Sequence, residues 1–269
     1  MLENLKILFI GCGKMGGAVL DGALKNGVLP KNVRVVDTSD DILMRCLSKR
    51  VHCGKKADFF QKFSPDIVFI ALKPHLVADM LKDVKPFTDN GALLLTIAAG
   101  KRIDGFKAAL GENTPVVRAM PNTPACIGKG VTGAFAGAAV TEEQKEKAAS
   151  LLQTCGELIW MRTEDDLDAV TAVSGSGPAY VFYFVEQLAE AAKKAGLPDD
   201  VCMTLAKQTV CGAAALMEQS GDSPAVLRQN VTTPGGTTAA ALAVFEQSLP
   251  DVMAKAVEAA KKRSRELAS

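Results

Sequence analysis

The motif "GCGKMG" at residues 11–16 follows directly on the apolar run "LKILFI" and leads into helix-forming sequence that continues to about Asn26. This is the GxGxxG pattern of a strand, a tight turn and a helix. In such a unit the first glycine makes the turn, the second lets a pyrophosphate approach the backbone, and the third lets the helix pack closely on the sheet. A glycine-rich turn without a ligand is the alternative, but the position after the first strand favours a dinucleotide-binding site.

Strand-like and helix-like segments alternate through the first part of the chain. Short apolar runs of four to seven residues are typical of strands that helices cover on both faces. After the first strand these runs are 33–36, 66–72, 92–98 and 115–120, followed by a strand pair at 131–136 and 157–161. Thr141 is well placed to cap the helix between that pair. The alternation predicts an α/β fold with an N-terminal Rossmann-type, doubly wound parallel sheet.

The strand pattern ends at about residue 163, where the charged stretch "RTEDD" is typical of a domain junction. Beyond it the sequence predicts helices near 164–173, 178–195, 199–219, 224–229, 236–248 and 251–267. We therefore predict a dinucleotide-binding Rossmann domain at 1–163 and an all-α domain at 164–269.

Two of the predicted helices, "TLAKQTVCGAAALM" (204–217) and "TAAALAVFEQSL" (238–249), are apolar around most of their circumference. Such helices belong in an interior, and a domain of roughly 106 residues hardly buries several of them alone. Packing on the sheet domain of the same chain is one solution. We favour a homodimer with two-fold symmetry, so the all-α domain is predicted to be the dimerisation domain.

Charge and composition exclude several classes of function. The formal net charge of +1 gives no electrostatic footprint for nucleic acid or an anionic membrane. The seven cysteines form no CxxC pair, and the apolar part of the N-terminus is too short for a signal sequence, so we expect free thiols in the cytoplasm. His52 and His75 have no companion ligands at metal spacing, and we expect no metal site.

Asp37 closes the second predicted strand, where an acidic side chain can accept hydrogen bonds from the hydroxyls of the adenine ribose. Taken alone, it favours NAD over NADP, although Thr38, Ser39 and Arg34 nearby offer groups for a 2′-phosphate. The cofactor is therefore predicted only as NADPH or NADH.

Three further loops are expected at the carboxyl edge of the sheet, where open α/β sheets bind ligands. "ALKPH" (71–75) carries a positive charge, "TIAAG" (96–100) leaves room for a nicotinamide ring, and "MPNTP" (120–124) offers short hydrogen-bonding groups. The predicted cofactor-binding residues are Gly11, Cys12, Gly13, Lys14, Met15, Gly16, Asp37, Leu72, Lys73, Pro74 and Ala98.

Two loops of small residues, "SGSGP" (174–178) and "TTPGG" (232–236), each precede a predicted helix. Both offer hydroxyls and unhindered N–H groups, which bind anions well at helix N-termini. Simple N-capping turns would explain the composition, but a carboxylate-binding pocket better explains why the pattern occurs twice.

The chain resembles the pyrroline-5-carboxylate reductases. The motifs "FIGCGKMGGA", "ALKPH", "VRAMPNTP", "AVSGSGPAY" and "NVTTPGGTT" occur in the order and spacing of that family, through essentially the whole chain. The resemblance implies NAD(P)H-dependent reduction of the cyclic imine Δ1-pyrroline-5-carboxylate to L-proline. It also implies a helical domain that interlocks with a second subunit, sometimes with further assembly into decamers.

The resemblance implies roles for single residues of the small-residue loops. Thr238 matches the family threonine whose hydroxyl contacts the ring nitrogen, and we predict it as the catalytic residue. The predicted substrate-binding residues are Ser174, Gly175, Thr233, Gly235, Gly236, Thr237 and Asn122. Asp37 departs from relatives that favour NADP, which commonly carry a neutral or phosphate-binding residue there.

Two other interpretations stay open. A β-hydroxyacid dehydrogenase also joins a Rossmann domain to a helical one, but it needs a lysine at the site, and Lys193, Lys194 and Lys207 are away from the small-residue loops. A non-enzymatic dinucleotide-sensing module would leave "TTPGGTT" unexplained.

Overall fold

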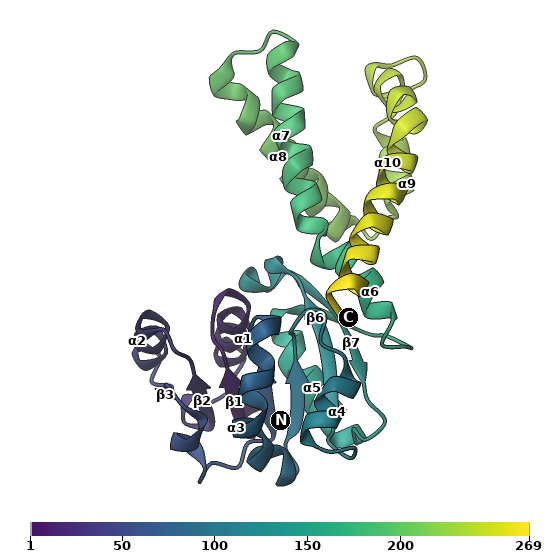
Figure 1. Cartoon of the computed structure of the whole chain (residues 1–269). Helices are drawn as coiled ribbons and strands as arrows, with labels where there is room; N and C mark the ends of the chain where they lie inside the picture. The colour runs from purple at the N-terminus through teal and green to yellow at the C-terminus, as the bar shows by residue number, and fades with distance from the viewer. Residues whose placement is uncertain (1, 269) are drawn as a thin grey trace. The chain divides into compact units, whose positions relative to one another are not determined.

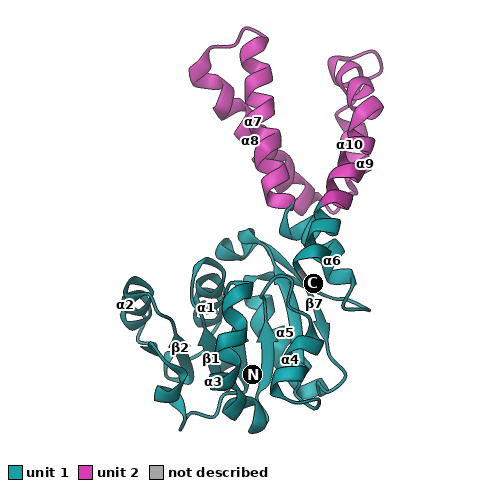
Figure 2. Cartoon of the chain, in the orientation of Figure 1, with its two compact units in different colours: residues 1–176, 260–269 teal, residues 177–259 magenta. Residues whose placement is uncertain are grey.

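The computed structural model describes residues 2–268, with the side chain of residue 268 left out. The chain forms two compact units (Figure 2). The sheet unit comprises residues 1–176 and 260–269, and the helical unit comprises residues 177–259.

The sheet unit is built on one eight-stranded sheet with the strand order β3-β2-β1-β4-β5-β6-β7-β8 (Figure 1). All neighbouring strands are parallel except β6 and β7, which are antiparallel. The strands are β1 (Ile7–Ile10), β2 (Val33–Val36), β3 (His52–Gly54), β4 (Ile67–Ile70), β5 (Leu93–Thr96), β6 (Val116–Pro121), β7 (Gly130–Ala136) and β8 (Gly156–Trp160). The predicted Rossmann-type fold is confirmed. The prediction missed β3, because its three residues form no apolar run.

Helices cover both faces of this sheet, as the apolar strands require. Phe9 packs with α1 and α5 on one face, and Leu8 packs with α3 and α4 on the other. The α-helices are α1 (Lys14–Lys25), α2 (Asp40–Ser48), α3 (Val77–Asp89), α4 (Ile103–Leu110), α5 (Glu142–Leu152) and α6 (Asp166–Val170). Thr141 caps α5 in a capping box with Gln144, as predicted.

Single helical turns connect these elements. The 3₁₀ turns are η1 (Leu2–Asn4), η2 (Pro30–Asn32), η3 (Ala57–Phe60), η4 (Pro74–Leu76), η5 (Thr123–Ile127) and η6 (Gln153–Cys155). A π-helical turn, η7 (Thr171–Gly175), follows α6, so the helix predicted at 164–173 is shorter than expected and changes type. Thr171 and Ser174 each donate a hydroxyl hydrogen bond to a carbonyl four residues earlier, which disturbs regular helix.

The helical unit contains α7 (Gly177–Lys194), α8 (Asp199–Ser220), α9 (Pro224–Asn230) and most of α10 (Thr237–Ala268). The prediction of separate helices at 236–248 and 251–267 is wrong, because α10 continues through Pro250. A proline inside a helix costs about 3 kcal/mol, but alanine and glutamate on both sides of it, and lysine after it, are strong helix formers. The favourable residues of this long helix therefore offset the local free-energy cost of Pro250.

The two units are divided at other places than the predicted domains, 1–163 and 164–269. α6 packs against β6 and β7, and Ser264 near the end of α10 donates a 2.7 Å hydrogen bond to buried Asp168 of α6. These contacts hold α6, η7 and the end of α10 with the sheet. The boundary at residue 163 was inferred from the change in sequence pattern, and it stays a prediction.

The helical unit buries few of its own apolar side chains. Its cluster of buried hydrophobic residues consists of Ala189, Cys202 and Ala206, where α7 meets α8. Large apolar side chains of the unit are exposed, among them Val181, Phe182, Tyr183, Phe184, Met203, Leu205, Leu216, Met217, Val244, Phe245, Val252 and Met253. An apolar cavity of about 610 Å³ is lined by residues of all four helices of this unit. Within residues 2–268, no helix is long and apolar enough to cross a membrane.

Candidate functional site

The glycine turn after β1 has the geometry that a dinucleotide needs. Gly11 has a φ of +87°, and a Cβ on Gly16 would lie 2.6 Å from the carbonyl oxygen of Gly11. A Cβ on Gly13 would meet no atom within 4 Å, so this backbone faces open space. Gly13 also precedes α1, whose first turn carries no acidic residue. A pyrophosphate can therefore approach the backbone and the positive end of the helix.

The side chain of Asp37 is held at the end of β2 by two backbone amides. One carboxylate oxygen accepts a 2.8 Å hydrogen bond from the N–H of Cys12, and the other accepts a 2.9 Å hydrogen bond from the N–H of Ser39. The Asp37 backbone in turn donates to the carbonyl of Gly54 at the end of β3. The carboxylate is thus fixed between the glycine turn and the start of α2.

Arg45 and Cys46 of α2 reach the same turn. Arg45 Nη2 donates a 2.7 Å hydrogen bond to the carbonyl of Cys12, and the Sγ atoms of Cys12 and Cys46 lie 4.0 Å apart. The contact with Cys46 and burial raise the pKa of the Cys12 thiol, so it stays neutral near pH 7. Residues 2–268 contain no group of three or more side chains that could hold a metal ion.

The remaining predicted cofactor residues lie at the same edge of the sheet. Ile10, Ile70 and Thr96 are in register across β1, β4 and β5, so the loops that follow them leave the sheet side by side. Leu72 and Lys73 lie in the loop after β4, and Pro74 begins η4. Ala98 follows β5, is buried, and donates its N–H to the Thr96 hydroxyl. The structure therefore brings the predicted cofactor loops together.

Asn122 at the end of β6 uses its side-chain amide to join two parts of the backbone. Its Nδ2 donates a 3.1 Å hydrogen bond to the carbonyl of Ser174, and its Oδ1 accepts a 2.9 Å hydrogen bond from the N–H of Val131. Asn122 is only 7% exposed. The structure thus brings Asn122, Ser174 and Gly175 together, and their contact with substrate stays a prediction.

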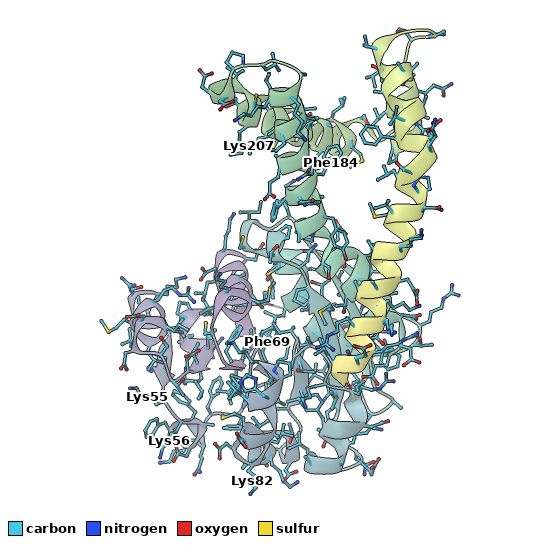
Figure 3. The ribbon with its side chains drawn as sticks, turned by 45° about the horizontal axis from the view of Figure 1, so that its top comes forward. Lys55, Lys56, Phe69, Lys82, Phe184 and Lys207 are labelled. Atoms are coloured by element: carbon cyan, nitrogen blue, oxygen red, sulfur yellow. The ribbon has the colours of Figure 1, made fainter. Side chains whose placement is uncertain are left out.

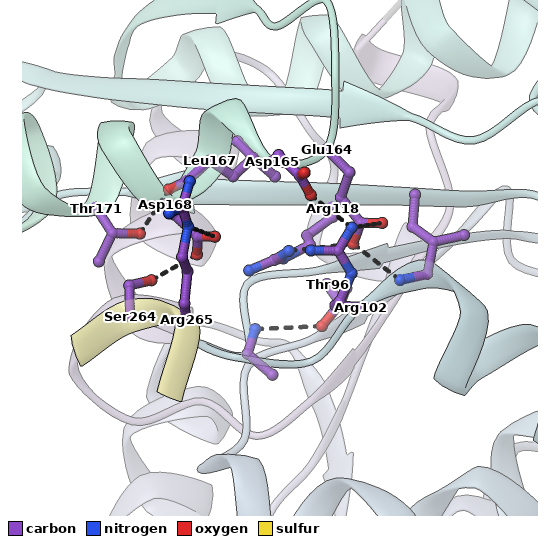
Figure 4. A network of polar contacts seen from close by, with 12 residues as sticks. Thr96, Arg102, Arg118, Glu164, Asp165, Leu167, Asp168, Thr171, Ser264 and Arg265 are labelled. Carbon is purple, nitrogen blue, oxygen red and sulfur yellow. Dashed lines mark hydrogen bonds and ion pairs between the residues drawn. The ribbon is translucent and has the colours of Figure 1, made fainter. Parts of the chain in front are cut away.

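Sequence reasoning missed a network of polar contacts around Arg118 and Glu164 (Figure 4). Arg118 of β6 is 1% exposed and donates from Nη1 to Glu164 at 3.1 Å. The same Glu164 oxygen accepts the N–H of Ile103 at the start of α4. Among the described residues, Nε and Nη2 of Arg118 have no hydrogen-bond partner. The only signal in the sequence was a single arginine inside the apolar run "VVRAMP".

The loop "TTPGGTT" belongs to the helical unit and turns sharply into α10. Gly235 has a φ of +71°, and the N–H of Gly236 donates a 3.0 Å hydrogen bond to the carbonyl of Thr233. A Cβ on Gly236 would lie 2.3 Å from the Thr233 hydroxyl oxygen, so a larger residue there would force the Thr233 side chain to move. Thr233, Gly235 and Thr237 are exposed, while Gly236 and Thr238 are half-buried. The first turn of α10 carries no acidic residue, which suits an anion.

A glycine turn open to a pyrophosphate, at the carboxyl edge of a Rossmann-type sheet, defines the class of dinucleotide-binding proteins. Two family models match this chain. Residues 6–100 match the model described as NADP oxidoreductase coenzyme F420-dependent, and residues 164–267 match the model described as pyrroline-5-carboxylate reductase dimerisation.

Individual proteins match over nearly their whole length. The pyrroline-5-carboxylate reductase of Pseudomonas aeruginosa is 35% identical, with 99% of this chain and 98% of the relative covered. The solved structure of the Coxiella burnetii enzyme is 36% identical, with 99% of both chains covered and a TM-score of 0.93. That of the Plasmodium falciparum enzyme, with NADP bound, is 30% identical, with 99% of both covered and a TM-score of 0.84. The chain belongs to the pyrroline-5-carboxylate reductase family.

Proposed function

We propose that this chain reduces Δ1-pyrroline-5-carboxylate to L-proline with NAD(P)H, the last step of proline biosynthesis. The observation that carries the proposal is that one chain combines the open glycine turn with the "TTPGGTT" loop while matching family members from end to end. The family resemblance identifies the substrate, and the geometry of each loop indicates which groups bind the cofactor and the substrate.

The cofactor-binding residues act by holding the pyrophosphate, the ribose and the nicotinamide ring in place. The open backbone at Gly13 and the N-terminus of α1 bind the pyrophosphate, and the fixed Asp37 carboxylate faces the adenine ribose. Ala98 presents no bulky side chain after β5, which leaves room for a flat ring. When bound, the reduced nicotinamide supplies a hydride to the imine carbon.

The helical unit supplies the groups for the substrate. The backbone N–H groups and hydroxyls of Thr233, Gly235, Gly236 and Thr237 bind the carboxylate, and the Thr238 hydroxyl hydrogen-bonds the ring nitrogen. A protonated imine is already electrophilic, so hydride addition to carbon gives the amine of proline directly. Positioning rather than a strong general acid therefore provides most of the rate enhancement.

The assay follows NAD(P)H absorbance with pyrroline-5-carboxylate as substrate and detects proline as product. We expect consumption of one cofactor for each proline formed. A β-hydroxyacid dehydrogenase would instead reduce NAD(P)⁺ with a 3-hydroxy acid, and a sensing module would bind the cofactor without turnover. Absence of cofactor consumption with the imine would contradict the proposal.

The helical unit forms the homodimer interface in this proposal. It is covered by the family's dimerisation model, and its exposed apolar side chains need a second chain. The family resemblance extends this to assembly of dimers into decamers, and light scattering on the purified protein distinguishes two from ten copies. All seven cysteines are free thiols, which suits a reducing cytoplasm.

A further inference from the structure

The charges around Asp37 decide which of the two nicotinamide cofactors the glycine turn accepts. We infer that this site is built for NADH and discriminates against NADPH, with Asp37 as the residue that determines the preference. The inference rests on the proposed function for the identity of the reaction, but it concerns cofactor binding alone.

The Asp37 carboxylate cannot easily turn away from the ribose. Each of its oxygens accepts one amide hydrogen bond, from Cys12 at 2.8 Å and from Ser39 at 2.9 Å. Each oxygen keeps lone-pair capacity for a second donor. Two vicinal ribose hydroxyls can supply such donors, whereas a 2′-phosphate would bring about two negative charges against a fixed carboxylate.

The start of α2, where a 2′-phosphate would find backbone N–H groups, is also acidic. Ser39 is the N-cap residue, and Asp40 and Asp41 occupy the first turn. With Asp37 they place three carboxylates within five residues. These side chains stabilise the positive end of the helix themselves and oppose a bound phosphate.

Two arginines near this position are each held by backbone carbonyls, which fix the guanidinium groups but leave them charged. Arg34 donates to the carbonyls of Lys31 and Val33 and lies 4.5 Å from the ring centroid of Phe63. Arg45 is hydrogen-bonded to the Cys12 carbonyl at 2.7 Å.

Lys55 lies on the loop after β3, next to Lys56 (Figure 3), and its Nζ is 2.8 Å from a carboxylate oxygen of Asp40. The adjacent Lys56 is exposed to solvent. With Asp40 paired to Lys55, the carboxylates of Asp37 and Asp41 remain, and a solvent-exposed lysine is a weak counterweight to them.

The test measures binding and turnover separately in the full-length enzyme. Fluorescence titration without imine gives the Kd of NADH and of NADPH, and steady-state assays give kcat/KM for each. We expect the wild-type protein to bind NADH at least roughly tenfold more tightly than NADPH. Asp37→Ser should weaken NADH binding by roughly tenfold to a hundredfold, the effect of losing one or two charge-assisted hydrogen bonds. The same change should improve NADPH binding.

Two further variants make the result decisive. Asp37→Asn removes the charge, but its amide nitrogen cannot accept the second of the two backbone N–H groups, so its melting temperature is measured together with each Kd. Improved NADPH binding despite that lost hydrogen bond shows that the charge sets the preference. Lys56→Ala should leave the NADH to NADPH ratio unchanged. Wild-type preference for NADPH, an Asp37→Ser ratio equal to wild type, or loss of NADPH binding in Lys56→Ala would each overturn the inference. Absence of imine turnover with a preserved Kd ratio would instead contradict only the proposed function.

Discussion

Two phenylalanines, both labelled in Figure 3, show how differently the two units are stabilised. Phe69 of β4 is fully buried and packs against Phe9, with ring centroids 5.1 Å apart. Phe184 of α7 is 44% exposed and lines the apolar cavity of the helical unit. The sheet unit therefore folds around its own core, whereas the helical unit presents apolar surface that a second chain must cover. In the proposed function, the sheet unit binds the cofactor, and the loop proposed to bind the substrate precedes α10 of the helical unit.

The largest effect is expected from the core of the sheet unit. Phe69→Ala should lower its free energy of unfolding by about 3–5 kcal/mol, because a buried ring leaves a cavity that neighbours fill only in part. Urea denaturation measures this, and the loss should not depend on protein concentration. Phe69→Leu should cost much less and keeps the measurement possible if the alanine variant is unfolded. An alanine variant as stable as wild type would show that β4 is not the centre of the core.

The next largest effect concerns the exposed face of α7. Phe184→Glu should raise the dimer dissociation constant by roughly a hundredfold or more, since it places an unpaired charge in an apolar interface. Analytical ultracentrifugation measures the dissociation constant. Lys82→Glu, on the exposed surface of α3, is the matched change in the sheet unit and should leave assembly unchanged. Equal dissociation constants for the Phe184 variant and wild type would show that this apolar face of the helical unit is not covered by a second chain.

The same contrast explains how much could be predicted from the sequence. The cofactor edge was predictable because parallel strands end at one edge, so the glycine turn, Asp37 and the loops after β4 and β5 had to meet there. The need for a second chain could also be predicted, because two helices are apolar around most of their circumference. Both conclusions depend on local patterns of sequence and on topology.

What could not be predicted depends on distant contacts. Arg118 is buried in a strand because Glu164, 46 positions away, accepts its hydrogen bond. Asn122 is held by Ser174, 52 positions away, so its side chain has a backbone-joining role that composition does not reveal. The continuity of α10 was missed for a local reason instead: the prediction ended a helix at Pro250, but the surrounding helix tolerates one lost hydrogen bond.

The two functional loops should respond differently to substitution. Thr238→Ala should lower kcat by roughly tenfold to a hundredfold, because the imine loses a group that orients it, while the Kd for NAD(P)H stays unchanged. Thr238→Ser keeps the hydroxyl and should restore most of the activity. Gly13→Val, the matched change in the sheet unit, should instead weaken cofactor binding, since its side chain enters the space open to the pyrophosphate. Unchanged kcat in Thr238→Ala would remove this hydroxyl from the mechanism.

The smallest effects come from two helix caps of similar chemistry in different units. The Thr141 hydroxyl accepts the N–H of Gln144 at 3.2 Å, and the Gln144 side chain accepts the N–H of Thr141 at 3.1 Å. In the helical unit, the Ser223 hydroxyl accepts the N–H of Val226 at 3.3 Å. Each change to alanine should cost about 1 kcal/mol or less.

Calorimetry at several protein concentrations distinguishes the two caps. Thr141→Ala should shift a transition whose midpoint does not depend on concentration, because the sheet unit carries its own core. Ser223→Ala should shift a transition that moves to higher temperature with concentration, because the helical unit is stabilised by association. A single transition that both variants shift equally would show that the two units unfold as one, and that the helical unit gains its stability from the sheet unit as much as from a partner.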